Sequence, residues 1–147
     1  MDETFVDFCK AGNLIGIINL IDKNKINIHK NDEEGFILAC FNGYLHIVEY
    51  LTNLYKINTD YKIINIHSDD ENGFIWACMR GYLHIVKYLI NLHKIRHNRN
   101  MDYKIINIHM NDEQSFMWAC RNRQKHIIKY LLSIGSYLPN HKYIFLL

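Results

Sequence analysis

The chain has 147 residues, enough for one ordinary domain with a buried core. Because 49% of the residues are hydrophobic and 22% are charged, the composition excludes a disordered chain. The formal net charge of +2 is too close to balance to argue for nucleic acid or an anionic membrane as a partner.

The chain opens with an acidic segment at residues 1–5, which lacks the basic start and apolar stretch of a secretory signal peptide. No apolar run approaches the ~20 residues that a membrane span requires. The four cysteines are therefore expected to be reduced thiols, and the protein is expected to be intracellular, in the cytoplasm, and not secreted.

Self-similarity is the dominant feature of the sequence. The segment Ile-Asn-Ile-His begins at Ile26, Ile64 and Ile106. Each copy leads through an acidic pair to a Phe-x-x-Ala-Cys segment. We predict repeats at about 26–60, 64–102 and 106–135, preceded by a degenerate copy at 3–25 and followed by a C-terminal cap or tail at 136–147. All of these lie in one domain that spans 1–147.

Each repeat is predicted to form a helix, a tight turn and a second helix. Phe36 and Cys40 fall on one face of the short first helix. Gly43 then ends that helix, because glycine tolerates a left-handed C-terminal turn. Leu45 and Val48 begin the apolar stripe of the second helix. Helices this short do not hold alone in water, so the helices and the repeats must stack.

The repeated unit resembles the ankyrin repeat. The segment Gly-Tyr-Leu-His-Ile-Val-Glu-Tyr-Leu at 43–51, copied at 81–89, is similar to the Gly-His-Leu-Glu-Ile-Val-Lys-Leu-Leu of that family. The Ala-Cys pair takes the place of its paired alanines. The resemblance implies an all-α, helix-turn-helix repeat solenoid with short hairpin or loop connections. It also implies a chain that binds another protein and is not an enzyme.

The variant pattern and the richness in Ile, Asn, Lys and Tyr further resemble the ankyrin-repeat proteins of giant DNA viruses of amoebae. That resemblance implies a viral protein in the host cell cytoplasm that acts on host proteins. We expect it to be a monomer.

The sequence departs from the family where the first helix begins. Ankyrin repeats usually carry Thr-Pro-Leu-His there, and these side chains hydrogen-bond within and between repeats. The matching residues at 34–37 are Glu-Gly-Phe-Ile. We therefore expect that polar network to be absent and larger apolar contacts from phenylalanine to replace it. The acidic pairs, such as Asp32 with Glu33, are interpreted as caps of the helix N-terminus.

The rows of histidines and cysteines do not predict a metal site. Equivalent residues of a repeat spread along the chain, whereas zinc needs four ligands that converge on one point. The sequence also lacks the motifs of serine hydrolases, phosphate-binding loops and zinc proteases. We predict no metal, no cofactor, no small-molecule substrate and no catalysis.

A basic segment at 94–99 is interpreted as a solvated loop between repeats. Nucleic-acid or anion binding through this segment is the alternative function. It lacks the aromatic residues on which single-stranded bases stack, which disfavours nucleic acid as a partner.

The resemblance places the partner on the hairpin tips and on the exposed face of the first helices. Equivalent positions there differ between copies, as a binding surface on a constant scaffold would. The pair Trp76 and Trp118 is expected in the core, and would be a binding hot spot if half exposed. The predicted partner-binding residues are His29, Lys30, Glu33, Phe41, Asn42, His67, Ser68, Glu71, Met79, Arg80, His109, Met110, Glu113, Arg121 and Asn122.

Overall fold

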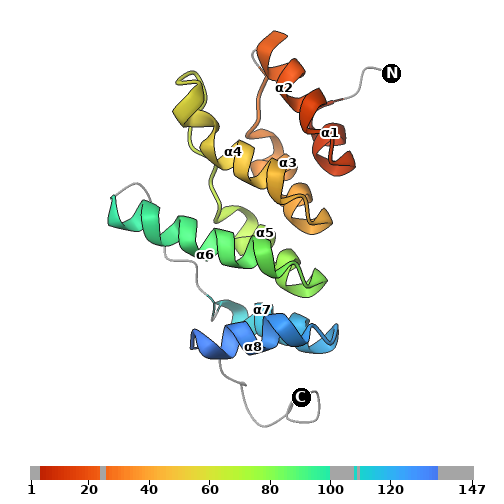
Figure 1. Cartoon of the computed structure of the whole chain (residues 1–147), viewed down its shortest axis with the longest axis vertical. Helices are drawn as coiled ribbons and strands as arrows, with labels where there is room; N and C mark the ends of the chain where they lie inside the picture. The colour runs from red at the N-terminus through yellow and green to blue at the C-terminus, as the bar shows by residue number, and fades with distance from the viewer. Residues whose placement is uncertain (1–3, 24–25, 100–107, 109, 136–147) are drawn as a thin grey trace. The chain divides into compact units, whose positions relative to one another are not determined.

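The computed structural model describes residues 4–23, 26–99, 108 and 110–135, with the side chains of 110–112 left outside the description. These residues form eight α-helices and no strand, so the predicted all-α class is confirmed (Figure 1). The predicted C-terminal cap or tail at 136–147 lies outside the described residues.

The helices come in pairs, one pair within each predicted repeat. The chain divides into two compact units, Met1–Gly73 and Phe74–Leu147. None of the described helices is both long enough and apolar enough to cross a membrane. The helices are α1 (Phe5–Ala11), α2 (Leu14–Lys23), α3 (Lys30–Asn42), α4 (Leu45–Ile57), α5 (Ser68–Arg80), α6 (Leu83–Asn98), α7 (Met110–Arg121) and α8 (Lys125–Ser133).

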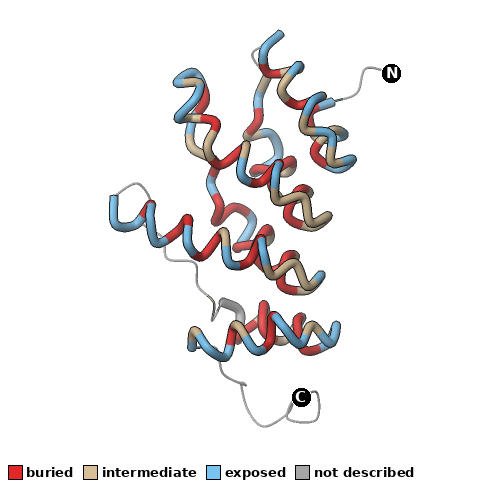
Figure 2. Tube along the Cα trace, in the orientation of Figure 1, coloured by how far each residue is buried: buried red, intermediate tan, exposed pale blue. Residues whose placement is uncertain are grey.

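Buried residues recur along each helix and alternate with exposed ones (Figure 2). In α3 the predicted face is confirmed, since Phe36 and Cys40 are almost completely buried. The equivalent residues of α5 and α7 are buried in the same way. In α4 the buried side chains include Ile47, Val48 and Leu51, which confirms the stripe predicted for the second helix.

The turn between the two helices of a repeat has glycine in a left-handed conformation, as predicted. Gly43 has φ 83° and ψ 18°, and the amide of Tyr44 donates to the carbonyl of Ala39 at 2.9 Å. This turn also contacts the preceding repeat. A Cβ placed on Gly12 would lie 2.8 Å from the Tyr44 ring, and His46 Nε2 lies 3.3 Å from the Gly12 carbonyl oxygen. The repeat at 26–60 therefore packs directly on the turn of the degenerate copy at 3–25.

Phenylalanine rings pack on glycines of the following repeat. A Cβ on Gly73 would lie only 2.8 Å from Cε1 of Phe36, and one on Gly35 would be equally crowded by Phe5. Because no side chain stands at these positions, the first helices can approach closely. The expected apolar contacts of phenylalanine at the start of the first helix are therefore present.

The basic segment at 94–99 is not a loop, and that prediction was wrong. Helix α6 continues to Asn98, so most of the segment is helical. Arg96 is only 2% exposed, whereas Lys94 and Arg99 are exposed. A helix places successive residues about 100° apart, so one cation points inward while its neighbours point out. The segment does not present a continuous basic loop to a ligand.

Candidate functional site

The structure separates the predicted partner-binding residues into buried and accessible groups. Lys30, Arg80, Arg121 and Asn122 are exposed, and His29, Phe41, Asn42 and Met79 are partly exposed. His109 and the side chain of Met110 lie outside the described residues. The expectation that the others lie on the surface is wrong, because five side chains are buried: Glu33, His67, Ser68, Glu71 and Glu113.

The backbone before the first helix explains why the glutamates turn inward. Asn31, Asp32 and Glu33 have φ values of 50°, 52° and 68°, so they form a left-handed turn and the right-handed part of α3 follows them. The same turn recurs at 69–71 in α5. Asn and Asp tolerate this conformation better than most residues. The Glu33 carboxylate bonds His29 and Asn65 instead of the free amides of its own helix, so the interpretation of the acidic pair as an N-terminal cap was wrong for Glu33.

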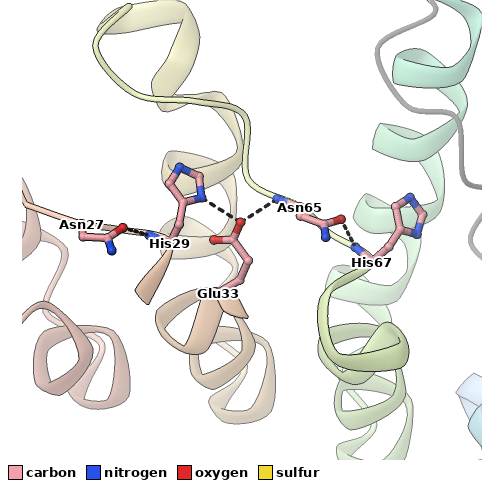
Figure 3. Close-up of polar contacts among 5 residues, drawn as sticks. All are labelled: Asn27, His29, Glu33, Asn65 and His67. Carbon is pink, nitrogen blue, oxygen red and sulfur yellow. Dashed lines mark hydrogen bonds and ion pairs between the residues drawn. The ribbon is translucent and has the colours of Figure 1, made fainter. Parts of the chain in front are cut away.

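Glu33 instead joins two successive repeats (Figure 3). Its Oε1 atom lies 2.8 Å from Nδ1 of His29 and accepts the backbone N–H of Asn65 at 2.9 Å. Asn65 belongs to the next repeat, 32 residues along the chain. Because the carboxylate can only accept, His29 places its ring proton on Nδ1. We call this arrangement of His29, Glu33 and Asn65 the glutamate clamp.

The asparagine of each Ile-Asn-Ile-His segment fixes the position of the histidine. The side-chain oxygen of Asn27 accepts the N–H of His29 at 3.0 Å, and Asn65 does the same for His67 at 3.1 Å. His67 Nδ1 then lies 2.8 Å from Glu71 Oε1, which repeats the first half of the clamp. A polar network thus joins the repeats at 26–60 and 64–102, and it is built from residues outside the Thr-Pro-Leu-His positions at 34–37.

A sequence signal for the clamp exists, although the predictions missed it. The spacing Asn-x-His-x-x-x-Glu recurs without change from Asn27, Asn65 and Asn107. A carboxylate repeated at constant spacing from a histidine indicates a paired, buried acid better than a solvent-exposed cap. His29 and His67 therefore each hydrogen-bond to a glutamate of their own repeat.

Most of the accessible predicted residues lie at the end of the first helices, whereas His29 and Lys30 lie at the start of α3. Phe41 and Asn42 end α3, and Met79 and Arg80 end α5. The two asparagines also serve the helices that they end: Asn42 Nδ2 donates to the Leu38 carbonyl at 2.9 Å, and Asn122 Nδ2 donates in the same way to Trp118.

The two tryptophans are neither in the core nor fully exposed. Trp76 and Trp118 are both of intermediate exposure, which corrects the expectation of complete burial. The Arg121 guanidinium lies over the Trp118 ring, 5.1 Å from its centroid. Such a cation–π contact holds the arginine against the aromatic face. Trp118 is thereby part of the accessible surface at the end of α7.

The cysteines are buried thiols rather than reactive groups. All four are free, and burial raises the pKa of each, in the case of Cys9 to about 12. A thiol that stays protonated is a poor nucleophile and a poor metal ligand. Among the described residues no three His, Cys, Asp or Glu side chains converge as a metal site would require.

The raised thiol pKa values predict that the fold weakens at alkaline pH. Cys40 is completely buried and its native pKa lies above the unfolded value of about 8.5. Above that pH the unfolded chain loses a proton that the native chain retains, so stability is full below the unfolded pKa and falls as pH rises. Between about pH 7.5 and about pH 9.5, each such thiol should cost about 1.4 kcal/mol of unfolding free energy.

Urea unfolding at both pH values measures this loss. The variant Cys40→Ala should lose less stability over the same pH interval than the unchanged chain, by about the contribution of one thiol. An equal loss in both proteins would contradict the assignment of this pH dependence to Cys40.

Comparison with known families agrees with the repeated helix pairs. The sequence profile described as Ankyrin repeats (3 copies) matches residues 7–100 and 36–141, which together cover most of the chain. No curated protein matches the chain in sequence. The predicted helical-repeat solenoid class is confirmed by this match and by the eight helices of the described residues. The chain therefore belongs to the ankyrin-repeat family, whose repeats are protein–protein interaction modules.

Proposed function

We propose that the chain binds a partner protein through the ends of its first helices. We call the residues concerned the helix-end positions: Phe41 and Asn42 in the first unit, and Met79, Arg80, Arg121 and Asn122 in the second. Each unit contacts the partner directly through its own helix-end positions.

One observation carries this proposal. Along each first helix the buried framework Phe-x-x-Ala-Cys is the same in every full repeat, whereas the next, accessible residue differs. That residue is Phe41, Met79 or Arg121. Phe, Met and Arg are enriched in the centres of protein interfaces, where a few such side chains supply most of the binding energy. The partly exposed Trp76 and Trp118 lie on the same helices and extend the apolar contact area.

Affinity purification with two charge variants tests the proposal. Phe41→Glu and Met79→Glu should each remove the partner captured by the unchanged chain, because a carboxylate replaces an apolar anchor. We expect at least about a tenfold loss of affinity for the recovered partner in a direct binding measurement.

A matched control comes from an exposed apolar residue on another helix. Ile57, at the end of α4, is 73% exposed, so Ile57→Glu makes the same chemical change away from the helix-end positions. It should leave binding unchanged. A partner that is retained by Phe41→Glu and Met79→Glu as well as by the control would contradict the proposed surface. That the partner is a host protein of a virus stays a prediction from the sequence resemblance.

A further inference from the structure

The near-neutral net charge conceals a strong division between the two units. Residues 1–73 contain six Lys and Arg against twelve Asp and Glu, a formal charge of −6. Residues 74–147 contain eleven Lys and Arg against three Asp and Glu, a formal charge of +8. Charge separated in this way creates a field that attracts an anionic partner to one unit, whatever the total charge.

Four exposed cations of the second unit lie at or beside the turns of its helix pairs. Gln124, between α7 and α8, donates from Nε2 to the carbonyl of Met79 at 3.2 Å and packs on Gly81. The α5–α6 turn and the α7–α8 turn are thus in contact, and Figure 1 shows both at the same end of their helix pairs. We call the exposed cations that flank these contacts the basic turn cluster: Arg80, Arg121, Arg123 and Lys125.

Arg123 occupies a position that favours glycine. The other repeats have Gly12, Gly43 and Gly81 at this point of the turn, with φ between 76° and 83°. Arg123 adopts φ 56° although it carries a side chain, which costs free energy that glycine would not. Backbone strain of this kind clusters at binding sites, which makes the exposed Arg123 cation a candidate contact for a ligand.

The second unit offers few carboxylates, since Asp102, Asp112 and Glu113 are its only acidic residues. Among the side chains described in the second unit, Glu113 is the only acid, and it is 1% exposed. Arg121 is held on the Trp118 ring, so its guanidinium is pre-positioned, and Trp118 itself is partly exposed. Arginine presents paired N–H donors that match a carboxylate, and the neighbouring ring offers an apolar contact.

We propose that the basic turn cluster docks an acidic segment of the partner protein, in which carboxylates alternate with apolar side chains. This inference rests on the proposed protein-binding function and adds the chemistry of the partner. It also extends the contact surface to Arg123 and Lys125, since Arg80 and Arg121 belong to the helix-end positions as well. The Arg and Lys side chains hold the carboxylates, and Trp118 contacts an adjacent apolar side chain. One face of the Trp118 ring carries the Arg121 guanidinium and so does not also stack on a base, which favours a peptide over a nucleic acid.

A labelled acidic peptide tests the cluster without knowledge of the natural partner. The probe is a fluorescein-labelled octapeptide in which the sequence Glu-Glu-Leu repeats. Fluorescence anisotropy measures the Kd of its complex with the full chain. We expect binding that weakens about tenfold between about 50 and about 200 mM NaCl, because exposed charges are screened. The variant Arg121→Gln/Arg123→Gly/Lys125→Gln should weaken binding at low salt by at least about tenfold.

The matched control removes three exposed cations elsewhere in the same unit. The variant Lys94→Gln/Arg99→Gln/Lys129→Gln has the same net charge as the cluster variant, so it should retain most of the peptide affinity. Equal losses in the two triple variants would overturn the cluster and leave only a general charge effect. The single variant Arg123→Gly should raise the thermal midpoint, since glycine relieves the turn, and yet weaken peptide binding.

An RNA or a second copy of the chain as the ligand of the basic turn cluster would give different results. A labelled single-stranded RNA of equal charge that binds more tightly than the peptide would overturn the peptide assignment in favour of nucleic acid. Self-association would appear in sedimentation as a mass that rises with protein concentration and falls in the cluster variant, and it would also overturn the proposal. If the peptide fails to bind while Phe41→Glu still abolishes partner capture, the proposed function stands and only this inference fails.

Discussion

Replacing Phe36 with alanine is expected to lower the free energy of unfolding by about 4 kcal/mol. Phe36 is almost fully buried on the inner face of α3, and its ring packs on the backbone of Gly73 in the next repeat. The substitution removes this contact and leaves a cavity that the short helices close only in part. Chemical denaturation monitored by circular dichroism measures the loss.

Phe41, on the same helix, provides a matched control. It has the same side chain but is partly exposed, so Phe41→Ala should cost no more than about 1 kcal/mol. Comparable losses for the two variants would mean that the ring of Phe36 does not hold successive repeats together. The comparison also separates the two roles assigned to phenylalanine in α3, packing for Phe36 and partner contact for Phe41.

The sequence alone predicted the helices, the turns and the buried faces, because each depends on local periodicity. Phe36 and Cys40 fall four residues apart, a spacing that only one face of a helix satisfies. Gly43 marks the turn because few other residues adopt its positive φ. Repetition strengthened each prediction, since one pattern was read several times along the chain.

The clamp escaped prediction because its geometry depends on a left-handed turn. An acidic pair just before a helix is most simply interpreted as an N-terminal cap. The positive φ values of 31–33 reverse the chain locally and send the Glu33 carboxylate inward instead. Only the constant spacing from Asn27 and His29 hinted at this arrangement. His29 and Glu33, which were both predicted to bind a partner, consequently join one repeat to the next.

The basic turn cluster was missed for a different reason. The charge was counted over the whole chain, where the acidic first unit cancels the basic second unit. A count over each half would have shown the division without a structure. The structure adds what counting cannot, namely that the Gln124 contact with Met79 brings two cationic turns together. It also shows that Arg96 does not contribute, because it is buried.

Replacing Glu33 with alanine is expected to cost about 3 kcal/mol of unfolding free energy. The substitution removes the acceptor of two hydrogen bonds, from His29 Nδ1 and from the Asn65 amide, and leaves both donors without it. Glu33→Gln should cost about half as much, because the amide oxygen can still accept one of the two. Urea unfolding measures both variants.

Hydrogen exchange locates the effect at the contact between repeats. The Asn65 amide should exchange faster in Glu33→Ala, whereas amides in the centre of α2 should follow only the global loss of stability. Glu34→Ala is the matched control. Glu34 is partly exposed, and among the described hydrogen bonds it accepts only from Asn31 Nδ2. Its replacement should therefore lower the free energy of unfolding by about 0.5 kcal/mol or less. If the two alanine variants were equally stable and the Asn65 amide equally protected in both, Glu33 would be an ordinary surface acid. A selective loss at Asn65 would mean that a single carboxylate couples the folding of one repeat to that of the next.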